Sequence, residues 1–282
     1  MSENLPKNIK DSLQQLRDAM QAALSSKCSR MDIEFPYGSN IGVEGRKTAT
    51  DSEVPMVMQD DAQASDRELA RAMVEMFRGT EIEQNLVVAF MDSPQANKAT
   101  KRWAGAFAGK VIVLDSKQNK RPARAGGGGF GASVKGTAVK AKTSAIPEGT
   151  EVLIVVSPSV KDLKALEQIC SEVGMGCLVI LANARLDELN YESESQRNFF
   201  LNEFERVYHL RPSPSPSWNG GVLFRAFPGD WVVAMPRKIG PPKVLYRSSQ
   251  KPSTEVIDVA LRKEKEATES SGGFPNPFSF FQ

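Results

Sequence analysis

The stretch Leu86-Val87-Val88-Ala89-Phe90-Met91 is a run of six consecutive apolar residues. A strand with one face in water alternates apolar and polar side chains, so an unbroken apolar run predicts a strand that is covered on both faces. Three more runs of this kind follow, at residues 111–114, 152–156 and 177–181. Strands of this kind are typical of parallel sheets with helices above and below, and we expect the four runs to lie side by side in one sheet.

Segments with helical periodicity separate these strands. Apolar side chains recur at helical spacing in residues 9–24, 69–77, 94–107 and 163–173. Ser65 and Glu68 have the spacing of a capping box, which predicts that the second of these helices starts there. Ser193 and Gln196 have the same spacing and predict a further helix, which extends to Phe204.

Two shorter patterns complete the order of elements. The run Met31-Asp32-Ile33-Glu34-Phe35 alternates apolar and acidic residues, which predicts a half-buried strand that Pro36 ends. Near the C-terminus, a last helix is expected to begin near Ser253. Short antiparallel strands separated by turns are predicted before it, at residues 222–227, 231–235 and 243–246.

This order of elements predicts an α/β fold. Helices that alternate with buried strands imply right-handed crossovers, and hence a mixed, mainly parallel sheet with helices on both faces and a C-terminal antiparallel meander. No linker divides the chain, so we expect a single domain over residues 5–268, interrupted by a flexible basic insertion at 116–150. Residues 269–282 are expected to form a disordered tail rich in phenylalanine. This tail would act either as an exposed binding motif or as a latch on the domain.

The composition limits the possible function classes. Among 282 residues, 40% are hydrophobic, but the longest apolar runs fall short of the roughly 20 residues that a membrane-spanning helix needs. Three cysteines are too few and too scattered for a disulfide scaffold or a thiolate metal site, and the single histidine excludes sites that need two imidazoles. We therefore expect a protein of a reducing compartment, without a metal or a cofactor. No secretory or transit peptide is recognisable at the N-terminus.

The basic residues are concentrated in one part of the chain. Residues 98–142 contain eleven Lys or Arg and one acid, whereas the rest contains 25 basic and 33 acidic residues. The insertion is therefore predicted to be an electrostatic tether for an anionic partner, with a solvated loop as the alternative. The candidate partners are an anionic membrane, an acidic protein and RNA. RNA comes last, because only Phe130 interleaves the cations and base-stacking platforms are absent. The predicted contacts are Lys117, Lys120, Arg121, Arg124, Lys135, Lys140 and Lys142.

Polar residues follow several of the apolar strands. In open α/β sheets, ligands bind beyond the carboxyl ends of the strands. Residues at these ends therefore form a candidate ligand site, although Ser93 and Ser159 have an alternative role as helix caps. The candidates are Asp92, Ser93, Ser159, Asn183 and Arg185.

Two other motifs carry no catalytic prediction. The glycine run at 126–131 lacks both a preceding strand and a following Gly-Lys-Ser or Gly-Lys-Thr, so it is interpreted as a linker and not as a phosphate loop. His209 has no Gly-x-Ser-x-Gly nucleophile elbow to work with and is interpreted as a structural histidine. We therefore predict no catalytic residues.

The segments 30–36 (RMDIEFP) and 218–231 (WNGGVLFRAFPGDW), taken with the buried strands, resemble a known family. It is the chloroplast-associated domain-of-unknown-function family that includes the low photosystem II accumulation 3 protein, and the same domain is found fused behind adenylate kinase in plants. The resemblance implies an α/β fold, a plastid location and, at the thylakoid, a role in photosystem assembly. It makes Asn219, Arg225 and Trp231 candidates for a partner surface.

These observations lead to one functional hypothesis and one alternative. We expect a non-enzymatic binding or assembly factor that assists photosystem biogenesis, with assembly components as partners. The alternative is an enzyme that binds a nucleotide or phosphate ligand at the carboxyl ends of the strands. Because no transit peptide is recognisable, a cytoplasmic location is the alternative to the plastid.

Overall fold

The computed structural model describes residues 5–36, 38–39, 59–103, 110–114, 146–213, 221–235, 237 and 240–269. Nine strands of these residues form one sheet: β1 Arg30–Glu34, β2 Leu86–Phe90, β3 Lys110–Val113, β4 Val152–Val156, β5 Leu178–Ala182, β6 Glu205–Pro212, β7 Val222–Ala226, β8 Trp231–Met235 and β9 Lys243–Ser248. Their order in the sheet is β3-β2-β4-β5-β1-β6-β7-β8-β9. Neighbours from β3 to β6 are parallel and those from β6 to β9 are antiparallel. The predicted mixed sheet with its C-terminal meander is confirmed, and the four apolar runs are neighbours in it.

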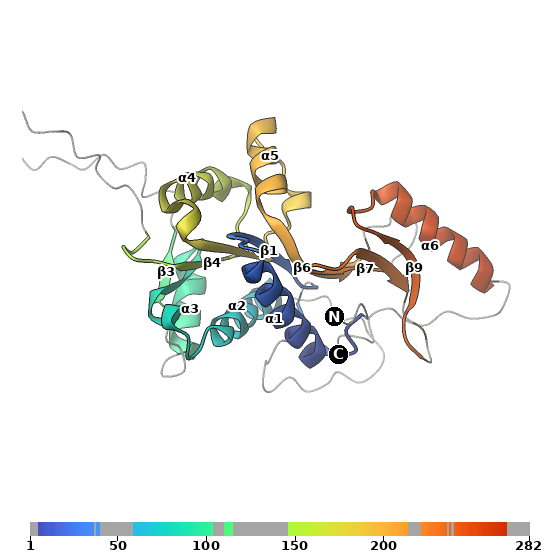
Figure 1. Ribbon diagram of the computed structural model, residues 1–282, viewed down its shortest axis with the longest axis horizontal. Helices are drawn as coiled ribbons and strands as arrows, with labels where there is room; N and C mark the ends of the chain where they lie inside the picture. The colour runs from blue at the N-terminus through green and yellow to red at the C-terminus, as the bar shows by residue number, and fades with distance from the viewer. Residues whose placement is uncertain are drawn as a thin grey trace, which may run out of the picture.

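Helices cover both faces of the sheet (Figure 1). One face carries α1 Ile9–Ser25, α2 Gln59–Met76 and α3 Ser93–Trp103, and the other carries α4 Leu163–Val173, α5 Glu194–Glu203 and α6 Thr254–Glu269. Alternate residues of each buried strand point to opposite faces. In β4, for example, Ile154 packs in the core under α1–α3, whereas Leu153 packs in the core under α4 and α5. A third, smaller core joins α6 to β7 and β8.

The first helix illustrates how sequence produces this packing. The side chain of Asn8 caps α1 by accepting a hydrogen bond from the Asp11 N–H, at 3.0 Å. Leu16, Met20 and Ala23, spaced at three and four residues, are buried on one side of this helix. This apolar stripe therefore decides which side of α1 faces the sheet.

The predicted start of α2 is wrong. The helix begins at Gln59, six residues before Ser65, so Ser65 lies inside it. The Ser65 hydroxyl donates to the carbonyl of Ser39, at 2.6 Å, and does not cap the helix. Glu68 pairs with Arg71 and Arg102 in place of closing a capping box. Ser65 and Glu68 thus have the spacing of a capping box, but their side chains make other contacts.

The prediction of a half-buried strand at 31–35 is also wrong. All five residues of β1 are buried, because the strand lies in the middle of the sheet between β5 and β6. Met31 and Ile33 face the core under α1–α3. Asp32 and Glu34 face the other side, where they are 0% and 3% exposed. The alternating apolar and acidic residues of β1 therefore face an apolar core on one side and a buried group of charged side chains on the other. Neither side faces water.

Several predictions lie outside the described residues. These include the basic insertion over 115–145, Asn219, and the tail from residue 270 onward. Among the helices that the structure describes, none is long and apolar enough to cross a membrane.

Candidate functional site

At two places in the sheet, the connections that follow two neighbouring strands lead to helices on opposite faces. The helices that follow β1 and β2 are α2 and α3, on one face, whereas those that follow β4 and β5 are α4 and α5, on the other (Figure 1). Because β2 lies beside β4 and β1 beside β5, the connections diverge at both pairs. In α/β proteins, ligands bind outside the carboxyl ends of the strands at points of divergence like these.

A carboxylate ties the ends of the strands together in this region. Both oxygens of Asp66, in α2, accept hydrogen bonds: one from the Ser157 hydroxyl beyond β4 and one from the Asn183 amide beyond β5, each at 2.5 Å. The Asn183 side-chain oxygen accepts a third bond, from the N–H of Phe35 beyond β1, at 2.7 Å. One helix and three strand ends are therefore joined by three side chains, which we call the Asp66 cluster: Asp66, Ser157 and Asn183.

The backbone around the Asp66 cluster is unusual. Ser157, Asn183 and Arg185 all have left-handed conformations, with φ of 46°, 53° and 51°. Residues other than glycine adopt this region at a cost of order 1–3 kcal/mol, although asparagine tolerates it better than most. Strained residues cluster at active sites and ligand-binding sites, so this edge of the sheet is our first candidate site.

The electrostatics of the Asp66 cluster follow from its partial burial. Burial raises the pKa of Asp66, while the hydrogen bonds from Ser157 and Asn183 and the charges of Arg185 and Arg67 act in the opposite direction. The net effect is a pKa above the usual 3.8. A carboxyl group, a hydroxyl and a partly exposed guanidinium thus lie at one edge, a set that can hold a polar or anionic ligand or transfer a proton.

Two of the predicted ligand residues belong to this site. Asn183 is a member of the Asp66 cluster, and the charge of Arg185 acts on Asp66. Asp92 lies at the end of β2, where its side chain accepts the N–H of Gln95, at 2.8 Å. It is therefore Asp92 that caps α3, and the alternative role of Ser93 as the cap is wrong.

Ser159 lies at the cap of a helical turn, the role that the sequence offered as the alternative to ligand binding. Its N–H and hydroxyl both donate to one oxygen of Asp162, at 2.9 and 2.5 Å. These bonds hold the turn that leads into α4.

Asp66, the residue at the centre of the site, was not predicted from the sequence. Asp66 lies four residues from both Ala62 and Ala70, which are buried on the apolar side of α2. A carboxylate inside an apolar stripe is a signal that a pattern search can find, because such a group needs a buried partner. Ser157 carries no comparable signal.

A second polar feature lies on the face of the sheet that carries α4–α6. A one-residue bulge in β6 places Val207 and Tyr208 in the apolar core and turns Arg206 and His209 toward Asp32. The Nε2 atom of His209 lies 2.9 Å from an Asp32 oxygen. The charged network, as we call this group, consists of Asp32, Glu34, Arg206, His209 and Arg211.

The network is buried and densely paired. Nδ1 of His209 lies 3.3 Å from an oxygen of Glu34, and that carboxylate also accepts a 2.9 Å bond from Arg211. Arg206 lies 3.4 Å from Asp32 and 3.5 Å from Asp187. Pairing of this kind offsets part of the cost of removing each charge from water. His209 therefore holds β6 to β1, in the middle of the sheet.

The predicted partner-surface residues border this network. Trp231 is only 3% exposed and packs edge-on against His209, with the cations of Arg225 and Lys251 over its ring. A partner does not reach the Trp231 ring in this structure. Arg225 is bound to Glu205 at 2.6 Å.

One residue at the edge of the charged network shows how strongly the charges act on each other. Burial alone would raise the pKa of Asp187, but Lys251 and Arg206 lower it to about 2.

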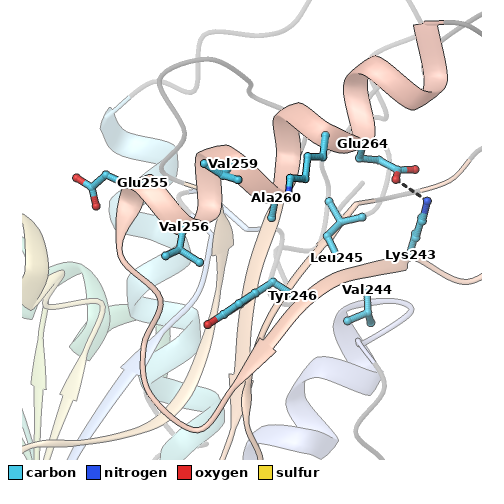
Figure 2. A pocket seen from close by; sticks show the side chains of 10 residues that line it. Lys243, Val244, Leu245, Tyr246, Glu255, Val256, Val259, Ala260 and Glu264 are labelled. Carbon is cyan, nitrogen blue, oxygen red and sulfur yellow. Dashed lines mark hydrogen bonds and ion pairs between the residues drawn. The ribbon is translucent and has the colours of Figure 1, made fainter.

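A third feature is an apolar groove of about 560 Å³ between β9 and α6 (Figure 2). Its walls are Val244, Leu245 and Tyr246 of the strand and Val256, Val259 and Ala260 of the helix. Figure 2 shows an ion pair at one end, where Lys243 and Glu264 lie 2.5 Å apart. We call this feature the β9–α6 groove.

The sheet, its helices and its polar carboxyl edge define an α/β protein with a parallel half and an antiparallel meander. The chain belongs to the family described as Domain of unknown function (DUF1995), whose model matches residues 6–259. No curated protein and no solved structure matches the chain. The expected membership of a domain-of-unknown-function family is thereby confirmed.

Proposed function

We propose that the protein is a non-enzymatic assembly factor that attaches to an anionic membrane surface through the carboxyl edge of its sheet. The resemblance to plastid proteins suggests photosystem components in the thylakoid as the assembling partners. The observation that carries the proposal is where the basic insertion starts. The N–H of Leu114 donates to the Phe90 carbonyl at 2.8 Å, at the carboxyl ends of β2 and β3, so the chain enters the insertion at the same edge as Arg185.

The charge of the insertion is sufficient for this role. Seven cations and no acid lie between residues 117 and 142. Near an anionic lipid surface each contributes about 1 kcal/mol, an effect that falls off within a Debye length. Three or four engaged at once would give measurable attachment that salt reverses, without a folded pocket.

Co-sedimentation with vesicles tests the proposal. Wild type is expected to pellet with vesicles that contain phosphatidylglycerol at low salt, to be released at high salt, and to ignore vesicles of phosphatidylcholine alone. A variant with the seven insertion cations changed to Gln should stay in solution. The matched control removes seven exposed cations elsewhere by the same change and should still pellet: Lys7, Lys10, Arg17, Lys161, Lys164, Arg197 and Lys263.

Two outcomes would reject membrane attachment. Wild type that ignores the anionic vesicles contradicts it directly, and co-purification of an acidic protein through the same seven cations would replace the membrane by that protein. Equal loss of binding in both Gln variants would show that net charge matters and the insertion does not.

A second candidate function is an enzyme that acts on a phosphate ligand or a nucleotide at the carboxyl ends of the strands. The Asp66 carboxylate favours it, because it accepts a hydrogen bond from the Ser157 hydroxyl and a positioned carboxylate can take part in proton transfer. ATP turnover well above background, lost in both Asp66→Asn and Arg185→Gln, would support this function over the first. Turnover at background in wild type would leave the assembly factor as the better proposal.

A further inference from the structure

Exposed apolar side chains gather at the β9–α6 groove. Five large hydrophobic residues of the described chain are exposed, and three of them line this groove: Val244 at 43%, Val256 at 38% and Val259 at 50%. The other two, Leu24 and Met175, lie on other elements. Clusters of exposed apolar residues mark contact sites more often than scattered ones do.

The helix that forms one wall has two apolar sides. Ile257 and Leu261 are 1% and 0% exposed and pack against Leu223, Trp231 and Val233 of the sheet. Val256 and Val259 are three residues apart on α6 and border the groove, where Figure 2 shows them with Tyr246 on the facing strand. A helix that needed only its contact with the sheet would carry polar residues at these two positions.

The side chains at the groove's margin limit the choice of occupant. The charged residues of its lining are Lys243, Lys263, Glu255 and Glu264, so the lining carries no net charge. Lys243 and Glu264 also neutralise each other directly. An uncharged, apolar segment therefore suits this groove better than a basic or an acidic one.

The chain supplies such a segment next to the groove. Residues 270–282 (SSGGFPNPFSFFQ) follow α6 directly and contain four phenylalanines and no charged residue. From Val256 to the end of α6 the helix is about 20 Å long, at 1.5 Å per residue. Eight residues from Phe274 to Phe281 span up to about 28 Å when extended, and the glycines at 272 and 273 permit the chain to reverse.

We propose that the phenylalanine-rich tail of this chain docks into the β9–α6 groove of the same molecule and covers Val244, Val256 and Val259. A tethered segment meets its site at an effective concentration in the millimolar range, which favours it over an untethered competitor of similar affinity. The proposal does not depend on membrane attachment, since none of its residues belongs to the carboxyl edge.

Methyl NMR of valine-labelled full-length protein gives the first test. Changing Phe274, Phe278, Phe280 and Phe281 together to Ser should shift the methyl signals of Val244, Val256 and Val259. Signals of valines in the central strand β4 should stay in place, which also shows that the variant is folded. Unchanged groove signals would overturn the proposal. The proposal would also be overturned if the groove signals of the wild type moved to the positions of the variant's signals on dilution. The occupant would then be the tail of a second copy.

Proteolysis of the tail gives a second, independent measurement. Val259→Glu places a charge in the groove at an exposed position and should speed chymotrypsin cleavage after Phe278 by at least about tenfold, because cleavage follows the population of the released tail. The matched control Met175→Glu adds the same charge at an exposed position outside the groove and should leave the rate unchanged. Equal cleavage rates in wild type and Val259→Glu would contradict docking.

Discussion

Replacing Asp66 by Ala should destabilise the protein through the ends of its strands. The change removes the acceptor for the Ser157 hydroxyl and for the amide of Asn183, a residue that is only 4% exposed. Leaving a buried donor without a partner costs about 1–3 kcal/mol, so two donors together predict a loss near 3 kcal/mol, reduced somewhat because a desolvated carboxylate is also removed. For a domain of this size that corresponds to a fall in Tm of roughly 6–12 °C.

Asp66→Asn should behave differently, and this contrast tests the geometry. The Asn oxygen can accept from the Asn183 amide, while its NH₂ group donates to the Ser157 oxygen, which accepts as well as donates. We expect a loss of no more than about 1 kcal/mol at neutral pH, because both neighbours keep a partner.

The difference in stability between wild type and Asp66→Asn should change with pH in one direction. Because the folded pKa of Asp66 is raised above 3.8, the folded state binds the proton more tightly than the unfolded state. The stability that this proton provides is complete below pH 3.8 and is lost as the pH rises through the folded pKa. Asp66→Asn lacks this titration, so its stability relative to wild type should improve as the pH is raised from 4 to 7.

Urea denaturation followed by tryptophan fluorescence measures the free energy of unfolding of wild type, Asp66→Ala and Asp66→Asn, since Trp103 and Trp231 are buried. Equal m-values would show that the comparison concerns stability alone. Asp18→Ala, at an exposed aspartate of α1, is the matched control and should stay within about 0.5 kcal/mol of wild type. An Asp66→Ala variant no less stable than this control, or an Asp66→Asn variant that loses as much stability as Asp66→Ala, would contradict the hydrogen bonding described for Asp66.

Two further predictions concern buried groups elsewhere. Asp32→Ala removes the nearer of the two carboxylates that each of the buried side chains Arg206 and His209 faces, and should cost about 3 kcal/mol in urea denaturation. A loss under about 1 kcal/mol would contradict the described pairing. Burial raises the pKa of Cys170 to about 11, so in the native protein at pH 8 its thiol should react with iodoacetamide more slowly than that of the partly exposed Cys28, as followed by mass spectrometry. Equal rates at the two thiols would contradict the burial of Cys170.

The elements that the sequence predicted well are those whose signal is local. The all-apolar run of β4 has no water-facing side, so only a place inside a covered sheet suits it. Ser193 caps α5 as its spacing with Gln196 predicts, accepting the Gln196 N–H at 3.1 Å. In each case the residues that form the signal also form the contact.

The predictions that failed depended on distant partners. Ser65 and Glu68 had the correct spacing for a cap, but Ser39 and Arg102 offered them other bonds. Asp32 had the pattern of a water-facing residue, yet β6 places His209 beside it, 177 residues away in sequence. Local spacing cannot report such partners, because they approach only when the chain folds.

The sequence predicted where some residues of the candidate site lie, but it did not predict all of them. The rule that ligands bind beyond the carboxyl ends of strands located Asn183 and Arg185 correctly at the edge, because all parallel strands end there. It could not identify Asp66, which reaches the edge from a helix, or Ser157, whose role depends on Asp66.

The sequence by itself therefore determined the class of fold, through apolar runs and helical stripes that have few alternative places in a folded protein. It also determined the uneven charge of the chain and the apolar character of its last residues. Only the tertiary structure decided which polar groups are buried together. The energy of a buried charge depends on the partner that lies within a few ångströms, and strand order, a bulge in β6 and helix placement bring those partners together.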